Sequence, residues 1–272
     1  TDVSLTIMAT IDAPVIPAGT GEETTLTETT GAMPAGVNEK TITVSDVDTS
    51  DLVSARITSL TIGDGSATTA QTPSLEALKA MLTINETAVE AGKTAGSVTW
   101  KFDSGTEAFD YLAEGEKLVL EYSVKVADNN GGAAGLTVTV TIVGTNDAPV
   151  VSVMSGDVTD DANTTTSATD SLTAAGNVIT NHTTDIDASD THTIVRVNGN
   201  ADNVGQPVHG TYGDMLVKAD GTYTYTLNNN AVNVQALAQD ETHNEVFSVT
   251  VSDGHGGETT QDIAITVHGT ND

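Results

Sequence analysis

The chain contains no cysteine, which excludes disulfide bonds as a means of stabilising it. Basic residues are scarce as well: nine Lys and Arg stand against 38 Asp and Glu, a formal net charge of −29 at pH 7. Nucleic acids and anionic membrane surfaces are bound through basic patches, so this balance argues against both as partners. The negative net charge suits multivalent cations as partners. For an extracellular chain without disulfides, a metal ion bound by oxygen ligands is the obvious means of stabilisation.

Long apolar runs are also missing. No segment approaches the roughly 20 apolar residues of a membrane-spanning helix, and no signal peptide stands at the N-terminus. The chain opens directly on Val3–Ile7, a strand-like run that fits the end of a preceding domain. We therefore expect a segment of a longer array, with no direct insertion into a membrane.

A short acidic joint occurs three times. It is clearest at Val143–Val150, returns at Val267–Asp272, and has a diverged copy at Met8–Val15. The spacing between copies is domain-sized, and each interval is long enough to bury a core. We predict the end of a preceding repeat at residues 1–12, a first repeat at 13–147 and a second at 148–272.

Strand signals dominate both repeats. Thr41–Val44, Val119–Val126 and Leu136–Ile142 are rich in β-branched residues and largely alternate, as do Phe247–Asp253 and Ile263–Val267. Alternation gives each strand one buried and one solvated face, as in an antiparallel β-sandwich. The sequence thus predicts tandem all-β domains.

Two smaller features refine this prediction. Gly210–Leu216 and Asp220–Leu227 predict two strands joined at a tight Asp-Gly turn. One short helix is expected in the first repeat, with Thr72 as its cap, Pro73 at its first position, and Leu75, Leu78, Met81 and Leu82 on one face. Trp100 is expected in the core.

Acidic residues cluster at corresponding places in the two repeats. Asp46, Asp48 and Asp51 follow a strand, and Asp185, Asp187 and Asp190 match them in the second repeat. The turns at Asp128 and Asp253 match each other, as do the acidic positions near Glu116 and Glu241, all at a shift of 125 residues. Acidic residues are common in turns. Aspartates on alternate residues of an extended loop, however, project towards one point and favour a hard cation.

The second repeat resembles a known family. It carries Gly210-Thr211-Tyr212-Gly213, then Asp220–Asn228, Val251–Gly257 and a closing Gly269-Thr270-Asn271-Asp272, and this pattern is similar to the VCBS-type repeat of giant bacterial RTX adhesins. The first repeat resembles a variant of it through Trp100–Ala113. The resemblance implies cadherin-like or immunoglobulin-like sandwiches, type I secretion to the bacterial cell surface, and Ca²⁺ between consecutive domains.

Carried onto this chain, the resemblance and the acidic pattern give a set of expected Ca²⁺ ligands. If each repeat has seven strands with its termini at opposite ends, alternating strand direction gathers several of them at the joint between the repeats. The expected ligands are Glu28, Asp46, Asp48, Asp51, Glu114, Glu116, Asp128, Asn146, Asp147, Asp160, Asp185, Asp187, Asp190 and Asp253. The first copy of the joint has Ala9 and Ile11 in place of Gly144 and Asn146, so weak or no metal is expected there.

These expectations favour a monomeric, Ca²⁺-stiffened extender whose partners are the neighbouring repeats of the same chain. The alternative is a repeat that itself binds a glycan, a peptide or a surface, with Tyr212, Tyr223, Tyr225 and Asn228–Asn230 as its site. Alternating Tyr on a strand more often pairs across a sheet, and the Thr-X-Thr runs suit solvated strand faces better than an ice-binding face.

An enzyme is not expected. The six His all lie in the second repeat without a tight metal-type pair, and His182 and His192 are expected to be solvated loop residues. The chain also lacks a Gly-X-Ser-X-Gly segment, a phosphate loop and a dinucleotide fingerprint.

Overall fold

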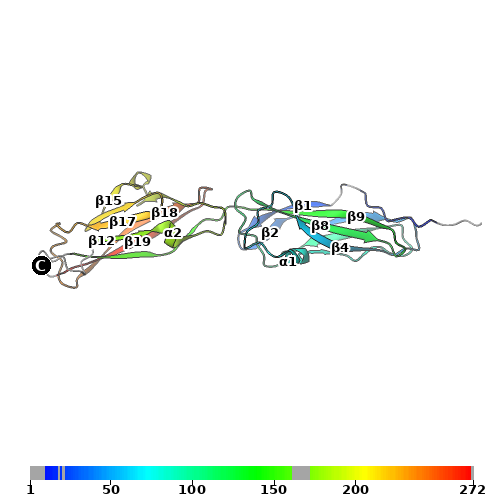
Figure 1. Ribbon diagram of the computed structural model, residues 1–272, viewed down its shortest axis with the longest axis horizontal. Helices are drawn as coiled ribbons and strands as arrows, with labels where there is room; N and C mark the ends of the chain where they lie inside the picture. Colours follow the sequence, from blue (N-terminus) through cyan, green and yellow to red (C-terminus); the bar gives the residue numbers. More distant parts are fainter. Residues whose placement is uncertain (1–9, 18, 20–21, 161–171, 271–272) are drawn as a thin grey trace, which may run out of the picture. The chain divides into compact units, whose positions relative to one another are not determined.

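The structure is a computed structural model that describes residues 10–17, 19, 22–160 and 172–270. The chain divides between Thr145 and Asn146 into two compact units, called unit 1 and unit 2 below. Each is built of β-strands around its own core (Figure 1). The all-β prediction is confirmed. The strand expected at Val3–Ile7 lies outside the described residues.

Unit 1 contains two sheets. The larger has the order β2-β1-β9-β8-β4-β6 and the smaller the order β3-β7-β5. β1 runs parallel to β9, whereas the other neighbours are antiparallel. The described residues form nine strands here, more than the seven assumed from sequence: β1 Glu23–Thr29, β2 Ala32–Gly36, β3 Glu39–Ser45, β4 Val53–Ile62, β5 Leu82–Ile84, β6 Thr87–Val89, β7 Ala95–Phe102, β8 Lys117–Ala127 and β9 Ala133–Val143.

The core of unit 1 follows from the alternation along its strands. On β8 the buried side chains are Leu118, Leu120, Tyr122, Val124 and Val126, every second residue. Trp100 is fully buried on β7, as expected, and the Tyr122 hydroxyl donates to the C=O of Leu78 at 2.7 Å. Alternation therefore decided which face of each strand packs inward.

Unit 2 contains two four-stranded sheets and a short two-stranded one. Their orders are β11-β19-β18-β14, β12-β17-β16-β15 and β10-β13. The predicted hairpin is present as β16 and β17, joined through Asp220 and Gly221. The strands are β10 Val150–Val151, β11 Met154–Thr159, β12 Thr173–Asn177, β13 Thr183–Thr184, β14 Thr193–Val197, β15 Pro207–His209, β16 Gly213–Val217, β17 Thr222–Leu227, β18 Thr242–Ser252 and β19 Glu258–His268.

The tyrosines of unit 2 do not form an exposed surface. Tyr223 and Tyr225 point into the core from β17, at 5% and 0% exposure, and Tyr225 packs against Phe247 with ring centroids 6.0 Å apart. They therefore cannot line a glycan site together with Tyr212. The alternative recognition site suggested by the sequence is wrong for these two residues, because alternation on β17 turns both inward.

The helices are short. α1 (Leu75–Ala80) is the helix expected in unit 1, but its cap is Ser74, whose hydroxyl accepts the Ala77 N–H at 3.3 Å. The prediction of Thr72 and Pro73 at its start is wrong, and Leu75 is 54% exposed rather than on the buried face. Unit 2 has α2 (Val178–His182) and the 3₁₀ turn η1 (Ala201–Asn203). None of the helices in the described residues has the length and apolar character needed to cross a membrane.

The C-terminal halves of the two units correspond at the 125-residue shift, and an equivalent parallel strand pair joins the N-terminal half to each of them. Leu26 on β1 pairs in parallel with Ile142 on β9, and Val158 on β11 pairs in parallel with Val267 on β19. The β8–β9 hairpin likewise matches the β18–β19 hairpin over 11 residue pairs each. Loops that occupy equivalent positions in sequence thus occupy equivalent positions in the two folds.

Candidate metal centre

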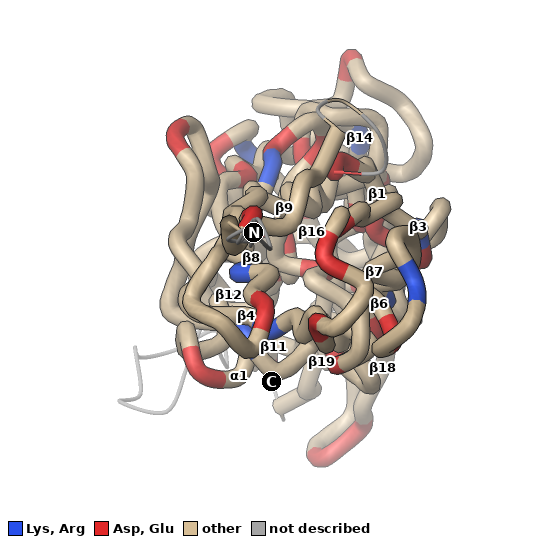
Figure 2. Tube along the Cα trace, turned by 90° about the vertical axis from the view of Figure 1, so that its right-hand side faces the viewer, with Lys and Arg blue, Asp and Glu red and all other residues tan. Residues whose placement is uncertain are grey.

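Acidic residues outnumber basic ones along the chain (Figure 2), and in unit 2 several of them meet where the unit begins. The loop between β13 and β14 folds around its own aspartates: Asp185 Oδ1 accepts the Asp187 N–H at 3.1 Å, and the Asp190 N–H donates to the Asp187 C=O at 3.1 Å. This geometry is an Asx-type turn followed by a second turn. It directs several carboxylates towards the start of the unit.

Asp253 joins this loop from the turn after β18. Its Oδ1 accepts the backbone N–H groups of His255 and Gly257 at 2.7 and 3.1 Å. A Cβ on Gly257 would lie 2.0 Å from Asp253 Oδ2 and 2.9 Å from the Cα of Ala148. Glycine is therefore required where the turn closes on the first residues of the unit.

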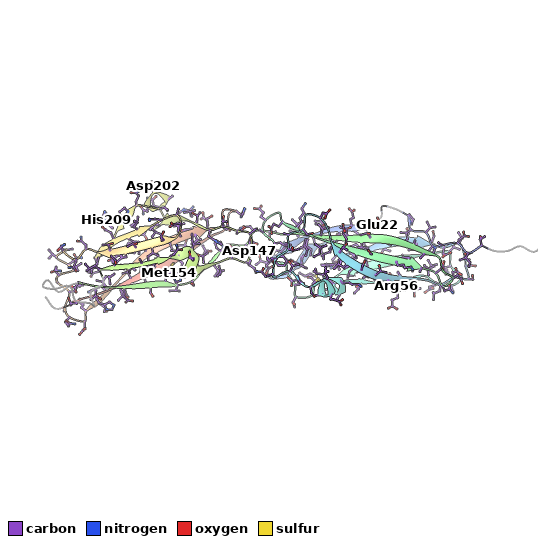
Figure 3. All side chains as sticks on the ribbon, in the orientation of Figure 1. Glu22, Arg56, Asp147, Met154, Asp202 and His209 are labelled. Atoms are coloured by element: carbon purple, nitrogen blue, oxygen red, sulfur yellow. The ribbon has the colours of Figure 1, made fainter. Side chains whose placement is uncertain are left out.

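Those first residues complete the cluster. The Asn146 side-chain amide donates to Asp253 Oδ2 at 3.0 Å, and the Asp147 N–H donates to Asp187 Oδ2 at 2.7 Å. Figure 3 labels Asp147 where the chain enters the unit. The entry of unit 2 is thus held by two of its own acidic side chains.

Two histidines take part, contrary to the expectation of solvated loop residues. His192 Nε2 lies 2.9 Å from Asp185 Oδ2, with 14% of its side chain exposed, so that expectation is wrong for this residue. His255 Nδ1 lies 3.1 Å from Asp190 Oδ1, and sequence analysis did not single it out. The only sequence signal that could have predicted its position in the cluster is that it follows Asp253 by two residues.

Several oxygens in the cluster are buried without a hydrogen-bond donor among the described residues. They include Asp187 Oδ1, Asp190 Oδ2 and the side-chain oxygen of Asn146. A buried charged oxygen without a donor costs several kcal/mol, and two carboxylates about 5 Å apart repel by about 3 kcal/mol at an effective dielectric near 20. A divalent cation removes both penalties, so the residues present fit a hard metal ion.

The titration of the cluster reflects this strain. Burial raises the pKa of Asp187 to about 7; the hydrogen bond from the Asp147 N–H opposes this shift, and the charges of Asp190, Asp147 and Asp185 add to it. Burial also acts on Asp253, but hydrogen bonds from Asn146 and from the backbone N–H groups of its turn outweigh it and lower its pKa. Asp253 is therefore ionised at neutral pH, whereas Asp187 is held near its midpoint.

Unit 1 repeats the arrangement with other residues. Asp46 Oδ1 accepts the Asp48 N–H at 3.0 Å, and the Asp12 N–H donates to Asp48 Oδ2 at 2.8 Å, as Asp147 does to Asp187. Carboxylate oxygens of Asp46, Asp51 and Asp128 lie within 4.8 Å of one another. One oxygen of each is buried without a donor among the described residues. Ile11 stands where unit 2 has Asn146, so one oxygen ligand fewer is available.

The far end of each unit holds a second, smaller acidic site. In unit 1 the N–H of Thr145 donates to Glu28 Oε2 at 2.9 Å. In unit 2 the N–H of Thr270 donates to Asp160 Oδ1 at 2.6 Å. Thr145 and Thr270 correspond at the 125-residue shift, and both acidic residues are buried.

Asp110 belongs to the Glu28 site and was not predicted. Its carboxylate accepts the Gly31 N–H at 3.1 Å and approaches within 4.8 Å of Glu28. No local pattern marks it, because Glu28 and Asp110 are far apart in sequence and meet only through the fold.

Glu114 and Glu116 are placed differently from the other expected ligands. Their loop contacts the last residues of unit 1, since the Gly144 N–H donates to the Glu116 C=O at 2.9 Å. The Glu116 carboxylate accepts the Ala113 N–H at 3.2 Å, and Glu114 is exposed. Both lie beside the exit of the chain from unit 1, outside the buried groups of carboxylates.

Comparison with known families decides the class of the second unit. Residues 146–269 match the family described as bacterial cadherin-like domain. Unit 2 is similar to bacterial cadherin-like domains over these residues. The matched residues begin at Asn146, the first residue of the compact unit.

Solved cadherin structures are similar to the whole chain at a lower level. Mouse protocadherin-24 EC1-3 is 16% identical, with 94% of this chain and 70% of that chain covered and a TM-score of 0.39. Human mucin-like protocadherin EC1-2 is 12% identical, with 94% and 98% covered and a TM-score of 0.43. A comparison with curated proteins finds no match.

The family assigns a general role to the cadherin-like unit. A cadherin-like domain implies an adhesion or extracellular repeat role, and domains of this type typically bind Ca²⁺ and contact adjacent domains. The acidic clusters described above are the part of this chain that suits such an ion.

Proposed function

We propose that the chain is a Ca²⁺-stiffened extender segment of a large secreted bacterial adhesin of the RTX type, which projects or contributes to surface binding and biofilm formation. The observation that supports the proposal is the repetition of one acidic cluster in both units. Carboxylate oxygens of Asp46, Asp51 and Asp128 gather in unit 1, and those of Asp190 and Asp253, which correspond to Asp51 and Asp128, gather with His255 in unit 2. In both units, buried carboxylate oxygens in this cluster lack a donor among the described residues.

Calcium is the ion that this donor set favours. The candidate ligands are carboxylates and an amide oxygen, which are hard donors, and their number suits the six to eight oxygens that Ca²⁺ takes. Zinc and copper sites are usually built around Cys or several His, whereas this chain has no Cys and the candidate group in unit 2 includes a single His, His255. His192 and His255 contact aspartates rather than each other. When bound, the ion supplies charge neutralisation and shared coordination for the loops.

Stiffening follows from the way the chain passes from one unit to the next. Thr145, the last residue of unit 1, donates a hydrogen bond to Glu28. Asn146 and Asp147, the first residues of unit 2, donate hydrogen bonds to Asp253 and Asp187 of the same unit. A cation held by Asp187 and Asp253 would fix the torsion angles of Asn146 and Asp147, through which the chain enters unit 2. Without it, the repulsion among the carboxylates favours open loops and a bent joint.

The remaining sequence features fit an exported repeat. Absence of cysteine and a strongly acidic composition suit a chain that folds only where Ca²⁺ is millimolar, outside the cell. The similarity of Gly210–Asn228 and of the Gly-Thr-Asn-Asp joints to VCBS-type repeats supports type I secretion and neighbouring repeats as partners, with the chain itself a monomer.

Small-angle scattering of the 272-residue chain tests the proposal. The expected result is a well-defined, extended particle in 5 to 10 mM Ca²⁺, the range in which weak extracellular sites at roughly 10⁻⁴–10⁻³ M are occupied, and a broader distance distribution in EDTA. Asp185→Ala plus Asp187→Ala should resemble the EDTA state even with Ca²⁺ present. Asp202→Ala plus Asp262→Ala removes the same charge from exposed sites and should behave like the parent chain. Identical profiles with and without Ca²⁺ would contradict the proposal.

A further inference from the structure

The two units differ at one sheet edge. In unit 1, β4 pairs with β8 from Ser54 opposite Ala127 to Ile62 opposite Leu120, with one irregularity between Ile57 and Ser59. The ladder continues beyond the strand, because the Gly63 N–H donates to the Val119 C=O at 2.9 Å and the Ala67 N–H donates to the Lys117 C=O at 2.7 Å. This edge of β8 is therefore covered throughout.

In unit 2 the corresponding strand stops early. β14 pairs with β18 only from Thr193 opposite Ser252 to Val197 opposite Val249. The chain then reverses at Asn198 and Gly199, whose φ angles are +49° and +74°. Asn-Gly with two positive φ angles forms a tight reverse turn, so the sequence itself ends the strand here.

The consequence is an open edge on β18. Asn198 still covers Ser248, since the Asn198 N–H donates to the Ser248 C=O at 2.8 Å and Asn198 Oδ1 accepts the Ser248 N–H at 2.9 Å. Alternate residues of an antiparallel strand direct their N–H and C=O to the same edge, so Val246 and Asn244 face the same way as Ser248. No strand of the described residues pairs with β18 on that side beyond Asn198.

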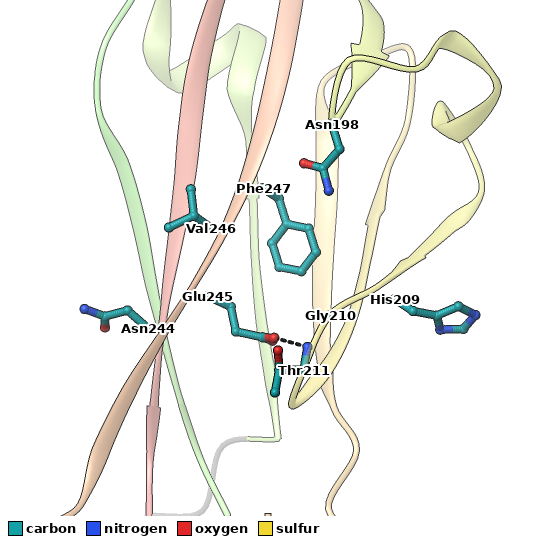
Figure 4. Close-up of a pocket in the computed structure, with 8 residues that line it drawn as sticks. All are labelled: Asn198, His209, Gly210, Thr211, Asn244, Glu245, Val246 and Phe247. Carbon is teal, nitrogen blue, oxygen red and sulfur yellow. Dashed lines mark hydrogen bonds between the residues drawn. The ribbon is translucent and has the colours of Figure 1, made fainter.

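A groove of about 460 Å³ lies along this edge. Its floor is Asn244–Phe247 and its opposite wall is the end of β15 with Gly210 and Thr211. Figure 4 shows Glu245 and Phe247 directed across the groove, whereas Asn244 and Val246 project from the other face of β18. The Glu245 carboxylate is already engaged: it accepts the N–H groups of Thr211 and Tyr212 and the Tyr225 hydroxyl. The groups of the groove that remain available for a ligand are therefore the backbone N–H and C=O groups on the open edge of β18.

We infer that this edge binds an extended, cationic peptide segment of a partner protein, which adds to β18 as a strand. Unit 1 supplies the precedent, since Ser59–Gly63 pair in the same way with the equivalent residues of β8. The charge of unit 2 favours a cationic peptide, because the unit has two basic and 18 acidic residues, a net charge of −16. Two copies of this unit would repel each other edge to edge, whereas a strand bearing Lys or Arg is attracted.

The test is an NMR titration of the isotope-labelled 272-residue chain in Ca²⁺. The probe is acetyl-Arg-Ile-Thr-Ser-Leu-Thr-Ile-Gly-amide, the sequence of residues 56–63. The expected result is a set of shifts confined to Asn198, residues 209–211 and residues 242–248. N-methylation of the probe at the amides equivalent to Thr61 and Gly63 should weaken binding at least tenfold. N-methylation at Leu60 and Ile62, whose amides face the other edge, should weaken it less than twofold.

The protein side offers a second arm. Val246→Pro removes only the outward N–H and should abolish binding, while Val246→Ala retains it. If the proline variant does not fold, the methylated probes still decide the matter on the unchanged protein. Absence of shifts at millimolar probe would overturn the inference. So would equal weakening by both methylation patterns, or shifts at 242–248 that follow protein concentration without probe, which would mean self-pairing. Because the edge shares no residue with the acidic cluster, binding that persists in EDTA separates this inference from the proposed role of Ca²⁺.

Discussion

The backbone N–H of Asp147 donates to the carboxylate of Asp187 at 2.7 Å, and that single bond ties the entry of unit 2 to a buried acidic side chain. The matching bond in unit 1 joins Asp12 to Asp48 at 2.8 Å. Both units therefore fix their first residues through an acidic side chain of the proposed metal site.

Replacing Asp187 with Asn should change the stability of unit 2 in opposite directions with and without Ca²⁺. In EDTA the variant should be as stable as the parent or more so, because one buried charge is removed while the amide oxygen still accepts the Asp147 N–H. In Ca²⁺ it should lose most of the stabilisation, which is about 2.7 kcal/mol at 100 times the Kd. Thermal melts in the two conditions measure this. Asp202→Asn, at an exposed position labelled in Figure 3, is the matched control and should melt like the parent in both.

The pKa of Asp187 near 7 sets a pH dependence for the metal-free chain. Its folded-state pKa is raised above the unfolded value near 4, so the folded state binds more protons between these values. Stability in EDTA should therefore fall as pH rises from about 4 to 7. We expect a fall on the order of 2 kcal/mol, half of the free energy that a three-unit pKa shift represents, because the loops relax. Urea titrations of the parent and of Asp187→Asn between pH 5 and 8 measure it. A slope shared by both proteins would show that Asp187 is not its source.

Glycine 257 should be needed for metal binding as much as for folding. Alanine there places a Cβ 2.0 Å from Asp253 Oδ2 and displaces that carboxylate. We expect Ca²⁺ affinity of unit 2 to fall at least tenfold by calorimetry. Gly135→Ala on β9, where the nearest atom to the added Cβ is 3.8 Å away, is the control and should leave the affinity unchanged. Equal affinities of the two variants would mean that Asp253 is not a ligand.

Glu245 is a structural anchor without a counterpart in unit 1, where the equivalent residue is Leu120. Glu245→Ala should destabilise unit 2 by about 3 kcal/mol or more, because it leaves the Thr211 and Tyr212 N–H groups and the Tyr225 hydroxyl without an acceptor. Burial and the neighbouring Glu245 raise the pKa of Tyr225, so its hydroxyl remains a donor at all ordinary pH values. Glu258→Ala removes an exposed carboxylate that pairs with Arg196 and should cost less than about 1 kcal/mol in the same denaturant melts.

The sequence was sufficient for features governed by alternation and by local turns. The existence of β8, β9, β18 and β19 and of the Asp220-Gly221 hairpin was predicted from side-chain period and turn chemistry. The helix start was misplaced because Thr72 and Ser74 are both acceptable cap residues, and the structure places the cap at Ser74, the better cap type of the two.

The site was harder to predict wherever contacts are long-range. Asp46, Asp48 and Asp51 are visible as a local pattern, and the structure brings Asp46 and Asp51 together with Asp128. The position of Asp110 beside Glu28 and the pairing of His192 with Asp185 depend on how loops distant in sequence meet. The early end of β14 was signalled by Asn198-Gly199, but its effect on β18 appears only when the two units are compared.

The most direct measurement is calorimetric melting of the 272-residue chain in 10 mM Ca²⁺ and in EDTA, alongside Asp185→Ala plus Asp187→Ala. We expect Ca²⁺ to raise the melting temperature of the parent chain by roughly 10 °C and the double variant to lose most of this gain in unit 2. Superimposable melts of the parent chain in Ca²⁺ and EDTA would contradict it.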